Sequence, residues 1–336
     1  MEWILLTSIL ISLAVTVLFL PSWIRRAKKA NLVGKDMNKN NEELVAESGG
    51  TIVIAGFLLG VLFYLAVRTF YFNTTENTIE ILGLIATILT ISFIGFIDDV
   101  LGWKIGLGRR LRILLVTLAA IPLMVINAGD STIYLPLFGV TNIGIVYPLL
   151  FIPLGIVGAS VTFNFIAGYN GLEAGQGIIL LSTLAIASWL TGSPWLSVIA
   201  LCMVGALAGF LFFNVYPTKV FPWDVLTYSV GALIAVMAIL GNYEQFAVFV
   251  FMPYILETFL KARGKLKKES FGVIQEDGSL KNKYDKFYGL EHICIALLRK
   301  FKKSGKAYEW EVVYLIYGIQ IGFSILGFII FFGGKL

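Results

Sequence analysis

Charged residues are scarce in this sequence of 336 amino acids. Only 14% of the residues are Asp, Glu, Lys or Arg, about half of the roughly 25% that is usual in soluble domains. Hydrophobic residues make up 58% of the chain, and the mean hydropathy is +0.85. A soluble domain could not bury that much apolar surface, so lipid must surround much of this chain.

Histidine and cysteine are nearly absent as well. His292 is the single histidine, which excludes a site built on several imidazoles. The two cysteines are Cys202, in an apolar run, and Cys294, in a basic segment. This pattern predicts neither a structural disulfide nor a cysteine metal site.

Long apolar runs dominate the rest of the sequence. A helix needs about 20 apolar residues to cross ~30 Å of hydrocarbon. We place ten such runs, at roughly residues 2–22, 50–70, 79–97, 111–127, 147–166, 176–191, 195–213, 225–240, 245–262 and 310–332. The sixth, eighth and ninth are short, which suits helices packed inside a bundle. The expected fold is therefore an all-α integral membrane protein, with a single membrane domain over residues 1–336.

The basic residues are concentrated in a few segments between these runs. Of the 26 Lys and Arg residues, six lie in 23–49, four in 98–112, one in 214–224 and thirteen in 261–309. Cytoplasmic loops of membrane proteins carry an excess of Lys and Arg. We therefore expect these four segments, and the short loop 167–175, on the cytoplasmic side, and ten spans then place both termini outside.

Two inter-helical segments have a character of their own. Residues 128–146 alternate β-branched and turn residues, which predicts a short external hairpin. Residues 263–309 are long, basic and aromatic. We expect them to form a cytoplasmic appendage between the last two membrane helices, with amphipathic pieces at the lipid surface.

Acids and amides gather at the predicted cytoplasmic helix ends. Asp98 and Asp99 end the third span, Asn164 and Asn170 flank the next cytoplasmic turn, and Asp224 opens the eighth span. Ionisable groups beside a bilayer core are costly and usually functional. Adjacent acids suit Mg²⁺, which binds one or two carboxylates plus substrate phosphate oxygens, or general-base work. The simpler alternative is that these side chains cap helices or face water.

Several basic side chains are weaker candidates. Arg112 begins the fourth span and could point into a cleft, although the charge bias of cytoplasmic loops explains most of its neighbours. Lys267 and Lys268 have the same explanation, together with attraction to anionic lipid. His292 suits the surface of an amphipathic helix better than a catalytic site.

Four stretches stand out when they are taken together and in order. They are GKDMNK (34–39) with ESGGTIVIAG (47–56), FIDDVLGWK (96–104), NFIAGYNGLEAGQ (164–176) and FNVYPTKVFPWDVLTYSVG (213–231). These stretches resemble one known family, the polyprenyl-phosphate N-acetylhexosamine-1-phosphate transferases of glycosyltransferase family 4. The resemblance covers about residues 30–260 and is strongest to the archaeal and eukaryotic branch, which transfers GlcNAc-1-phosphate from UDP-GlcNAc to dolichyl phosphate.

The resemblance implies roles for individual residues. Asn170 and Asp224 match the family's Mg²⁺ ligands, with Mn²⁺ as an alternative ion. Asp98 and Asp99 match its catalytic acid pair, and Arg112 stands where the family has an active-site lysine. Arginine can hold a phosphate, but as a planar fork rather than a point charge.

The resemblance also implies substrate contacts. Glu47 and Ser48 lie where the family's first loop approaches the nucleotide, and Asn164 matches an amide of the most diagnostic motif. In place of the family's Arg- or His-rich sugar-binding motif this chain has Lys267, Lys268 and His292. Trp223 stands where relatives often have glycine.

The implied activity is transfer of GlcNAc-1-phosphate, or another HexNAc-1-phosphate, from a UDP-sugar to dolichyl or polyprenyl phosphate, with release of UMP. It would occur at the cytoplasmic face of an archaeal plasma membrane or of the endoplasmic reticulum, as the first step of lipid-linked oligosaccharide synthesis for protein N-glycosylation. The implied partners are these two substrates, membrane lipids and a second copy in a homodimer, without nucleic acid.

Two other classes compete with this interpretation. A transporter or lipid flippase for a phosphorylated substrate would place ionisable groups near the membrane midplane, whereas the predicted spans hold few charges and those lie near their ends. A structural membrane protein with basic lipid-binding loops would leave the ordered acids and amides unexplained.

Overall fold

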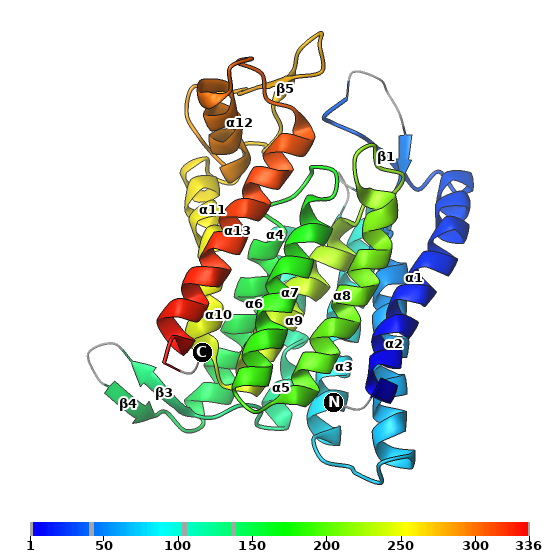
Figure 1. Cartoon of the computed structure of the whole chain (residues 1–336), viewed down its shortest axis with the longest axis vertical. Helices are drawn as coiled ribbons and strands as arrows, with labels where there is room; N and C mark the ends of the chain where they lie inside the picture. Colours follow the sequence, from blue (N-terminus) through cyan, green and yellow to red (C-terminus); the bar gives the residue numbers. More distant parts are fainter. Residues whose placement is uncertain (1–2, 40–43, 103–105, 136–138, 335–336) are drawn as a thin grey trace.

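The chain folds into a bundle of long helices with a small lobe, residues 264–308, at one end (Figure 1). The computed structural model describes residues 3–39, 44–102, 106–135 and 139–334. Its helices are α1 (Trp3–Lys29), α2 (Gly50–Phe70), α3 (Thr78–Leu101), α4 (Arg109–Leu118), α5 (Ile121–Val125), the π-helix η1 (Tyr147–Phe151), α6 (Ile152–Phe163), α7 (Leu172–Leu190), α8 (Pro194–Asn214), α9 (Trp223–Gly241), α10 (Glu244–Val250), α11 (Met252–Arg263), α12 (Leu290–Phe301) and α13 (Glu309–Phe332).

Seven of the described helices are long and apolar enough to cross a membrane: α1, α2, α3, α7, α8, α9 and α13. Helices α10 and α11 meet at a bend of 58° and count as an eighth span if taken together. Each of the ten predicted runs contains helix, so the all-α membrane architecture is confirmed. The number of ten spans is not, because α4, α5 and the apolar helix Tyr147–Phe163 are shorter than a full span.

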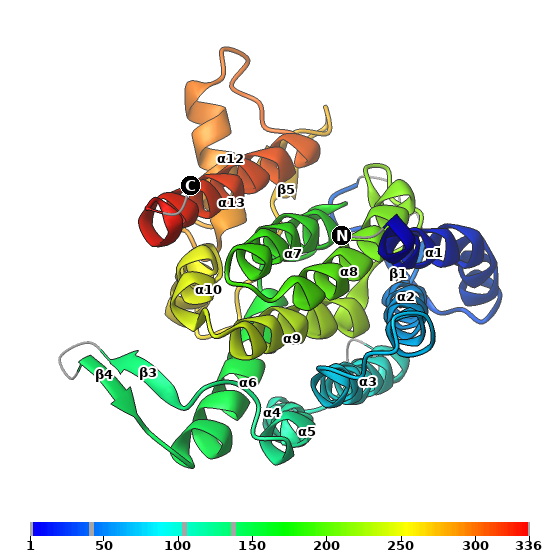
Figure 2. The same ribbon diagram turned by 60° about the horizontal axis from the view of Figure 1, so that its bottom comes forward.

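Helix α9 lies at the centre of the bundle. Seen from below, α6, α7, α8 and α3 surround it (Figure 2). Within its apolar stretch, 89% of the residues are buried. Apolar residues lie on every side of α9, as expected for a helix that is buried all round. The first turn of this central helix is therefore fixed by its neighbours, and Asp224 lies in that turn.

Close approach of helices at one side of the bundle depends on small residues. A Cβ atom added at Gly60 of α2 would lie 2.6 Å from the carbonyl oxygen of Ser8 in α1, and one at Gly56 would lie 2.8 Å from that of Ser12. Small residues let helix backbones pack this tightly in membranes. The pattern explains why α1 packs closely against α2.

Three short hairpins complete the described structure. They pair β1 (Val33–Lys35) with β2 (Leu44–Ala46), β3 (Thr132–Leu135) with β4 (Gly139–Asn142), and β5 (Val273–Ile274) with β6 (Leu280–Lys281), all antiparallel. The β3–β4 pair is the hairpin predicted within residues 128–146. It lies at the opposite end of the bundle from α12 and β1, as do both termini of the chain (Figure 1).

Candidate active site

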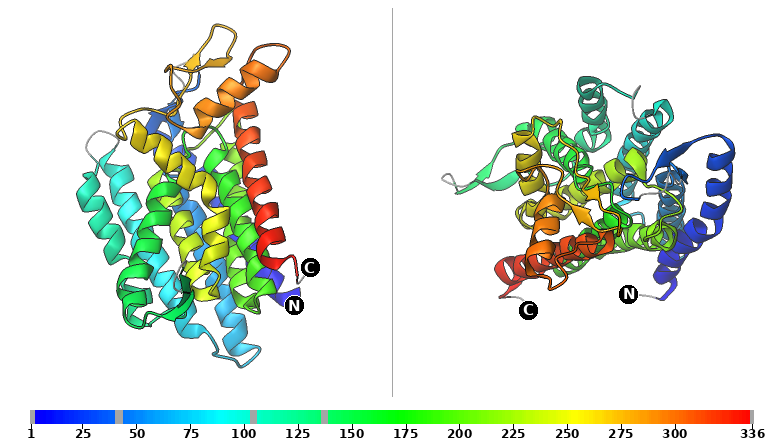
Figure 3. Two further views of the ribbon diagram at one scale, coloured as in Figure 1. Left: turned by 90° about the vertical axis from the view of Figure 1, so that its left-hand side faces the viewer. Right: turned by 90° about the horizontal axis from the view of Figure 1, so that it is seen from above.

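Five of the predicted polar residues meet where α3, α4, α6 and α9 come together. This is the end of the bundle that also carries β1 and α12 (Figure 3). Asp98 and Asp99 lie in the last turn of α3, Arg112 in the first turn of α4, and Asp224 in the first turn of α9. Asn164 is the residue directly after α6. Residues far apart in the sequence thus form one cluster at helix ends.

Arg112 joins two of the acids. Its Nη2 atom donates a short hydrogen bond to Oδ2 of Asp98, and its Nη1 atom lies 3.7 Å from Oδ2 of Asp224. Oδ1 of Asp98 also accepts a hydrogen bond of 2.5 Å from the amide of Leu107. The guanidinium fork therefore holds both carboxylates at once, which a single ammonium group could not do in the same geometry.

Asn164 contacts the second of these acids. Its side-chain amide Nδ2 donates a hydrogen bond of 2.8 Å to Oδ1 of Asp224. Asp224 thus has an amide on one carboxylate oxygen and the guanidinium of Arg112 near the other. The residue before it, Trp223, has a φ of 56°, in the left-handed region that favours glycine.

Asp99 faces a different set of partners from Asp98. Oδ2 of Asp99 accepts a hydrogen bond of 2.6 Å from the Ser48 hydroxyl, and Oδ1 accepts one of 3.0 Å from the backbone amide of Asp224. The amide of Val225 lies 3.4 Å from Oδ2. The two adjacent acids therefore have distinct environments: Asp98 is paired with a cation, and Asp99 binds a helix N-terminus.

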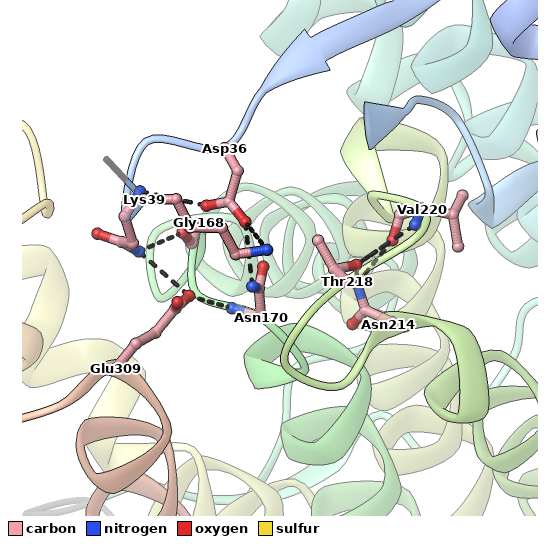
Figure 4. Close-up of polar contacts among 9 residues, drawn as sticks. Asp36, Lys39, Gly168, Asn170, Asn214, Thr218, Val220 and Glu309 are labelled. Atoms are coloured by element: carbon pink, nitrogen blue, oxygen red, sulfur yellow. Dashed lines mark hydrogen bonds and ion pairs between the residues drawn. The ribbon is translucent and has the colours of Figure 1, made fainter. Parts of the chain in front are cut away.

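A second polar cluster holds Asn170 (Figure 4). The side-chain amide of Asn170 donates to Asp36 at 3.1 Å, and its backbone amide donates to Glu309 of α13 at 2.8 Å. Asn38 donates to the same Glu309 oxygen at 3.3 Å, and Lys39 forms an ion pair of 2.9 Å with Asp36. The first loop, the loop before α7 and the start of α13 are thereby tied together.

The expected pairing of Asn170 with Asp224 needs correction. The described hydrogen bonds of Asn170 go to Asp36 and Glu309, whereas Asn164 is the amide in contact with Asp224. The motif contains two asparagines six residues apart, and the sequence alone does not say which of them faces the acid. The helix ends decide it, because Asn164 directly follows α6, which packs against α9.

The remaining predicted residues of the first loop are mostly buried. Ser48 has no exposed surface, and Glu47 is 9% exposed. The backbone carbonyl of Glu47 accepts a hydrogen bond of 2.8 Å from the indole of Trp23, and burial raises the pKa of its carboxyl to about 7. Ser48 is thus placed to hold Asp99 rather than to touch a ligand in solution.

His292 is buried inside the lobe and does not lie on the exposed surface of its helix, and its role as a substrate contact stays a prediction. The residue is 1% exposed, and its Nδ1 atom accepts a hydrogen bond of 3.2 Å from the amide of Tyr288. Burial, and secondarily the charge of Lys261, lowers its pKa to about 4. A neutral, buried imidazole packs the lobe and cannot act as a cation for phosphate.

The two predicted lysines lie in the same lobe. The ammonium of Lys268 is 4.7 Å from the ring centroid of Tyr284, a cation–π contact. Lys267 is exposed. The turn before them is near the acid cluster, because Arg109 of α4 donates a hydrogen bond of 3.0 Å to the carbonyl of Leu266.

The lobe also supports the loop that carries both asparagines. The ring of Phe271 lies against Gly168, where an added Cβ would approach it to 2.8 Å. Tyr169 stacks on the same ring at 6.4 Å and donates to the carbonyl of Ser270 at 3.2 Å. Any side chain at position 168 would therefore separate the lobe from the site loop.

An apolar groove of about 450 Å³ runs along the bundle beside the acid cluster. Its first lining residue, Ile113, directly follows Arg112 in α4. The groove is formed by α4, α5, η1 and α6, and its walls are Ile113, Thr117, Leu118, Ile121, Met124, Leu149, Leu150, Pro153, Leu154 and Val157. Its apolar walls suit a hydrocarbon chain.

The donor set fits a hard cation that also binds substrate. Within the described ranges no group of three His, Cys, Asp or Glu side chains is arranged to hold a metal ion by itself. Mg²⁺ commonly uses one or two carboxylates and takes its other ligands from water and substrate phosphates. The carboxylate of Asp224 and the amide oxygen of Asn164 offer such a partial set.

Four members of the second cluster were not predicted as site residues: Asp36, Asn38, Lys39 and Glu309. Asp36 and Asn38 lie in the GKDMNK stretch, so the signal was available in the acid and amide of that loop. The sequence signal for Glu309 is weaker, because an acid at a helix start is common and favourable on its own. Only the packing of α13 against α7 brings it to Asn170.

Comparisons with known proteins give consistent matches. The model of the family described as glycosyl transferase family 4 matches residues 81–242, which include Asp98, Arg112, Asn164 and Asp224. A protein of Saccharolobus solfataricus, provisionally named a UDP-N-acetylglucosamine–dolichyl-phosphate N-acetylglucosaminephosphotransferase, is 35% identical over 330 residues, covering 97% of this chain and 96% of the relative.

Two further relatives come from other branches of life. The Dictyostelium discoideum protein named UDP-N-acetylglucosamine–dolichyl-phosphate N-acetylglucosaminephosphotransferase is 30% identical over 315 residues, covering 82% of this chain and 75% of the relative. A phospho-N-acetylmuramoyl-pentapeptide-transferase of Halalkalibacterium halodurans is 27% identical over 341 residues, covering 97% of each chain.

Proposed function

The chain belongs to glycosyl transferase family 4 and is a phosphoglycosyltransferase, and from this premise we propose that it transfers GlcNAc-1-phosphate from UDP-GlcNAc to dolichyl or another polyprenyl phosphate. The names of the archaeal and Dictyostelium relatives support this choice of sugar and lipid. The observation that carries the proposal is the cluster of Asp98, Arg112, Asn164 and Asp224 at helix ends, directly beside an apolar groove.

The reaction joins two anionic phosphates. An oxygen of the lipid phosphate attacks the β-phosphorus of the UDP-sugar, the bond from that phosphorus to the bridging oxygen breaks, and UMP leaves with this oxygen. Such a transfer depends mainly on positioning and on stabilising charge at the phosphoryl oxygens. The prenyl chain lies in the groove along α4 and α6, which brings its phosphate to Arg112, one residue before the groove begins.

The acids, the arginine and the amide have different roles in this reaction. Arg112 donates to the phosphates, since its fork offers several N–H groups at fixed angles. Asp98 keeps that fork in place and accepts the proton of a lipid phosphate that still carries one. Asp224 and Asn164 would hold Mg²⁺, which when bound supplies positive charge for the diphosphate.

The cytoplasmic position of this site is part of the proposal. The segments that surround the site carry nearly all the Lys and Arg residues of the chain, which supports a cytoplasmic location. With α4–α5, η1–α6 and α10–α11 each counted as a crossing, the chain spans the membrane ten times and both termini lie outside. The lipid-linked sugar would then begin an oligosaccharide for protein N-glycosylation.

The test is UMP release by the purified full-length protein in detergent, with UDP-GlcNAc and dolichyl phosphate. We expect release that requires both substrates and a divalent cation. Release with a different UDP-sugar only would change the sugar and keep the reaction class. UMP release that does not require the lipid would indicate hydrolysis of the UDP-sugar, and no release with any UDP-sugar would favour a transporter; either result would contradict the proposal.

A further inference from the structure

The ESGG segment, residues 47–50, lies against the start of α9 and not against open solvent. Ser48 is fully buried, and its φ of 53° is in the left-handed region that non-glycine residues rarely adopt. Such conformations persist where surrounding structure enforces them, often at functional sites. The hydroxyl of Ser48 is directed by this backbone onto Oδ2 of Asp99, at 2.6 Å.

Helix α9 lacks a side-chain cap of its own. Its N-cap position is Pro222, which makes no side-chain capping hydrogen bond. The free amides of a helix start need acceptors, and Asp99 of α3 provides them by accepting from Asp224 at 3.0 Å and approaching Val225 at 3.4 Å. Asp99 therefore caps α9 from a neighbouring helix.

The backbone around Ser48 forms hydrogen bonds with the residues that precede α9. The amide of Phe221 donates to the carbonyl of Ala46 at 2.8 Å, and the amides of Gly49 and Gly50 donate to the carbonyls of Phe221 and Pro222 at 3.0 and 3.3 Å. A Cβ at Gly50 would lie 2.6 Å from the backbone nitrogen of Leu226. The two glycines thus let the first loop approach the α9 start this closely.

From these contacts we propose that Ser48 is a positioning residue: through Asp99 it fixes the N-terminus of α9 and with it the Asp224 carboxylate. Ser48 touches no substrate in this arrangement, because it has no exposed surface. The inference rests on the proposed function for its kinetic consequence, but its structural consequence stands apart from any activity. It replaces the expectation that Ser48 contacts the nucleotide.

The experiment compares Ser48→Ala with Thr51→Val in the full-length protein. Thr51 is a matched control, because its hydroxyl is buried three residues away and has no hydrogen-bond partner among the described residues. Amide hydrogen exchange of residues 221–226 is measured together with kcat, the KM for UDP-GlcNAc, and the Kd for UDP-GlcNAc without lipid phosphate. Ser48→Gly serves as a second variant, since glycine accepts this φ without strain.

For Ser48→Ala and Ser48→Gly we expect exchange at Asp224 and Val225 to accelerate and kcat to fall by about tenfold, the effect of one hydrogen bond to a charged group. KM and Kd should stay within about twofold of wild type, and Thr51→Val should match wild type throughout. In an Asp99→Asn background, Ser48→Ala should add little to the exchange rate, because the two residues act in series.

Three results would overturn the inference: unchanged exchange at residues 224 and 225, a raised KM and Kd with unchanged kcat, or a full Ser48→Ala effect on exchange in the Asp99→Asn background. A wild-type protein that transfers no sugar phosphate would instead overturn the proposed function. The exchange measurements would still decide whether Ser48 positions α9.

Discussion

At the scale of single residues, the two adjacent aspartates have different tasks. Asp98 pairs with Arg112, whereas Asp99 accepts from Ser48 and from the start of α9. The sequence alone presents them as one acid pair, because it does not show which neighbouring helix each carboxylate faces. Successive residues of a helix differ by a rotation about its axis. That rotation, about 100° per residue in an α-helix, sends one carboxylate to α4 and the other to α9.

Arg112→Lys tests the fork that spans two acids. The ammonium of lysine cannot contact Asp98 and Asp224 as the two Nη atoms do. We expect kcat/KM for transfer to fall by about 10- to 100-fold, in the range of about 1.5–3 kcal/mol for a hydrogen bond to a charged group. The neighbouring Arg110 is exposed, so Arg110→Lys is the control. Equal activity of both variants would show that a point charge suffices at position 112.

Glu47 predicts a dependence of stability on pH. Its folded pKa is raised by burial to about 7 from 4.5, so between these values the folded protein holds a proton that the unfolded chain has lost. Stability contributed by this group therefore falls as pH rises from about 4.5 to about 7, and levels off above that. The melting temperature in detergent should fall less over this window in Glu47→Gln than in wild type. Parallel curves would contradict the assignment.

At the scale of elements, the membrane helices were the easiest features to predict. Apolar runs of about 20 residues mark them directly, and α2 begins and ends at the expected residues 50 and 70. The breaks were harder: α4 ends at Leu118 and α5 starts at Ile121, and α10 meets α11 at a bend. Hydropathy averages over such breaks, since both sides are apolar.

Gly60 should be essential to the packing of α1 on α2. A methyl group there would lie 2.6 Å from the Ser8 carbonyl oxygen, and overpacking of this kind costs about 1–3 kcal/mol. Gly60→Ala is expected to lower the melting temperature in detergent. Gly158→Ala is the matched control in α6, where nothing lies within 4 Å of the added methyl. If both variants melt alike, helix approach at Gly60 is looser than described.

The groove between α4 and α6 should determine affinity for the lipid substrate. Val157 lines the groove, and Val157→Trp would fill part of it. The KM for dolichyl phosphate is therefore expected to rise about tenfold, while the KM for UDP-GlcNAc stays unchanged. Val248→Trp provides a control on α10, because Val248 is 55% exposed away from the groove lining. A rise in both KM values would indicate general damage, and no rise would place the prenyl chain elsewhere.

At the scale of the whole molecule, the loops of one bundle end converge on the site. The sequence placed Asp98, Asn164 and Asp224 on one face through the charge bias of the loops, and they do meet. It did not predict that Asn170 would instead join Asp36 and Glu309, because that requires the position of α13. Nor could it show His292 buried at 1% exposure, since a short amphipathic helix does not reveal what covers its apolar face.

The central claim is that the helix-end cluster around Asp224 moves a sugar together with its phosphate. The most direct measurement is mass spectrometry of the lipid product made from UDP-GlcNAc and dolichyl phosphate by the wild-type protein and by Asp224→Ala. We predict a dolichyl diphosphate that carries one GlcNAc, with UMP as the second product, and loss of both in the folded variant. A dolichyl monophosphate product with release of UDP, or wild-type turnover by Asp224→Ala, would contradict the account.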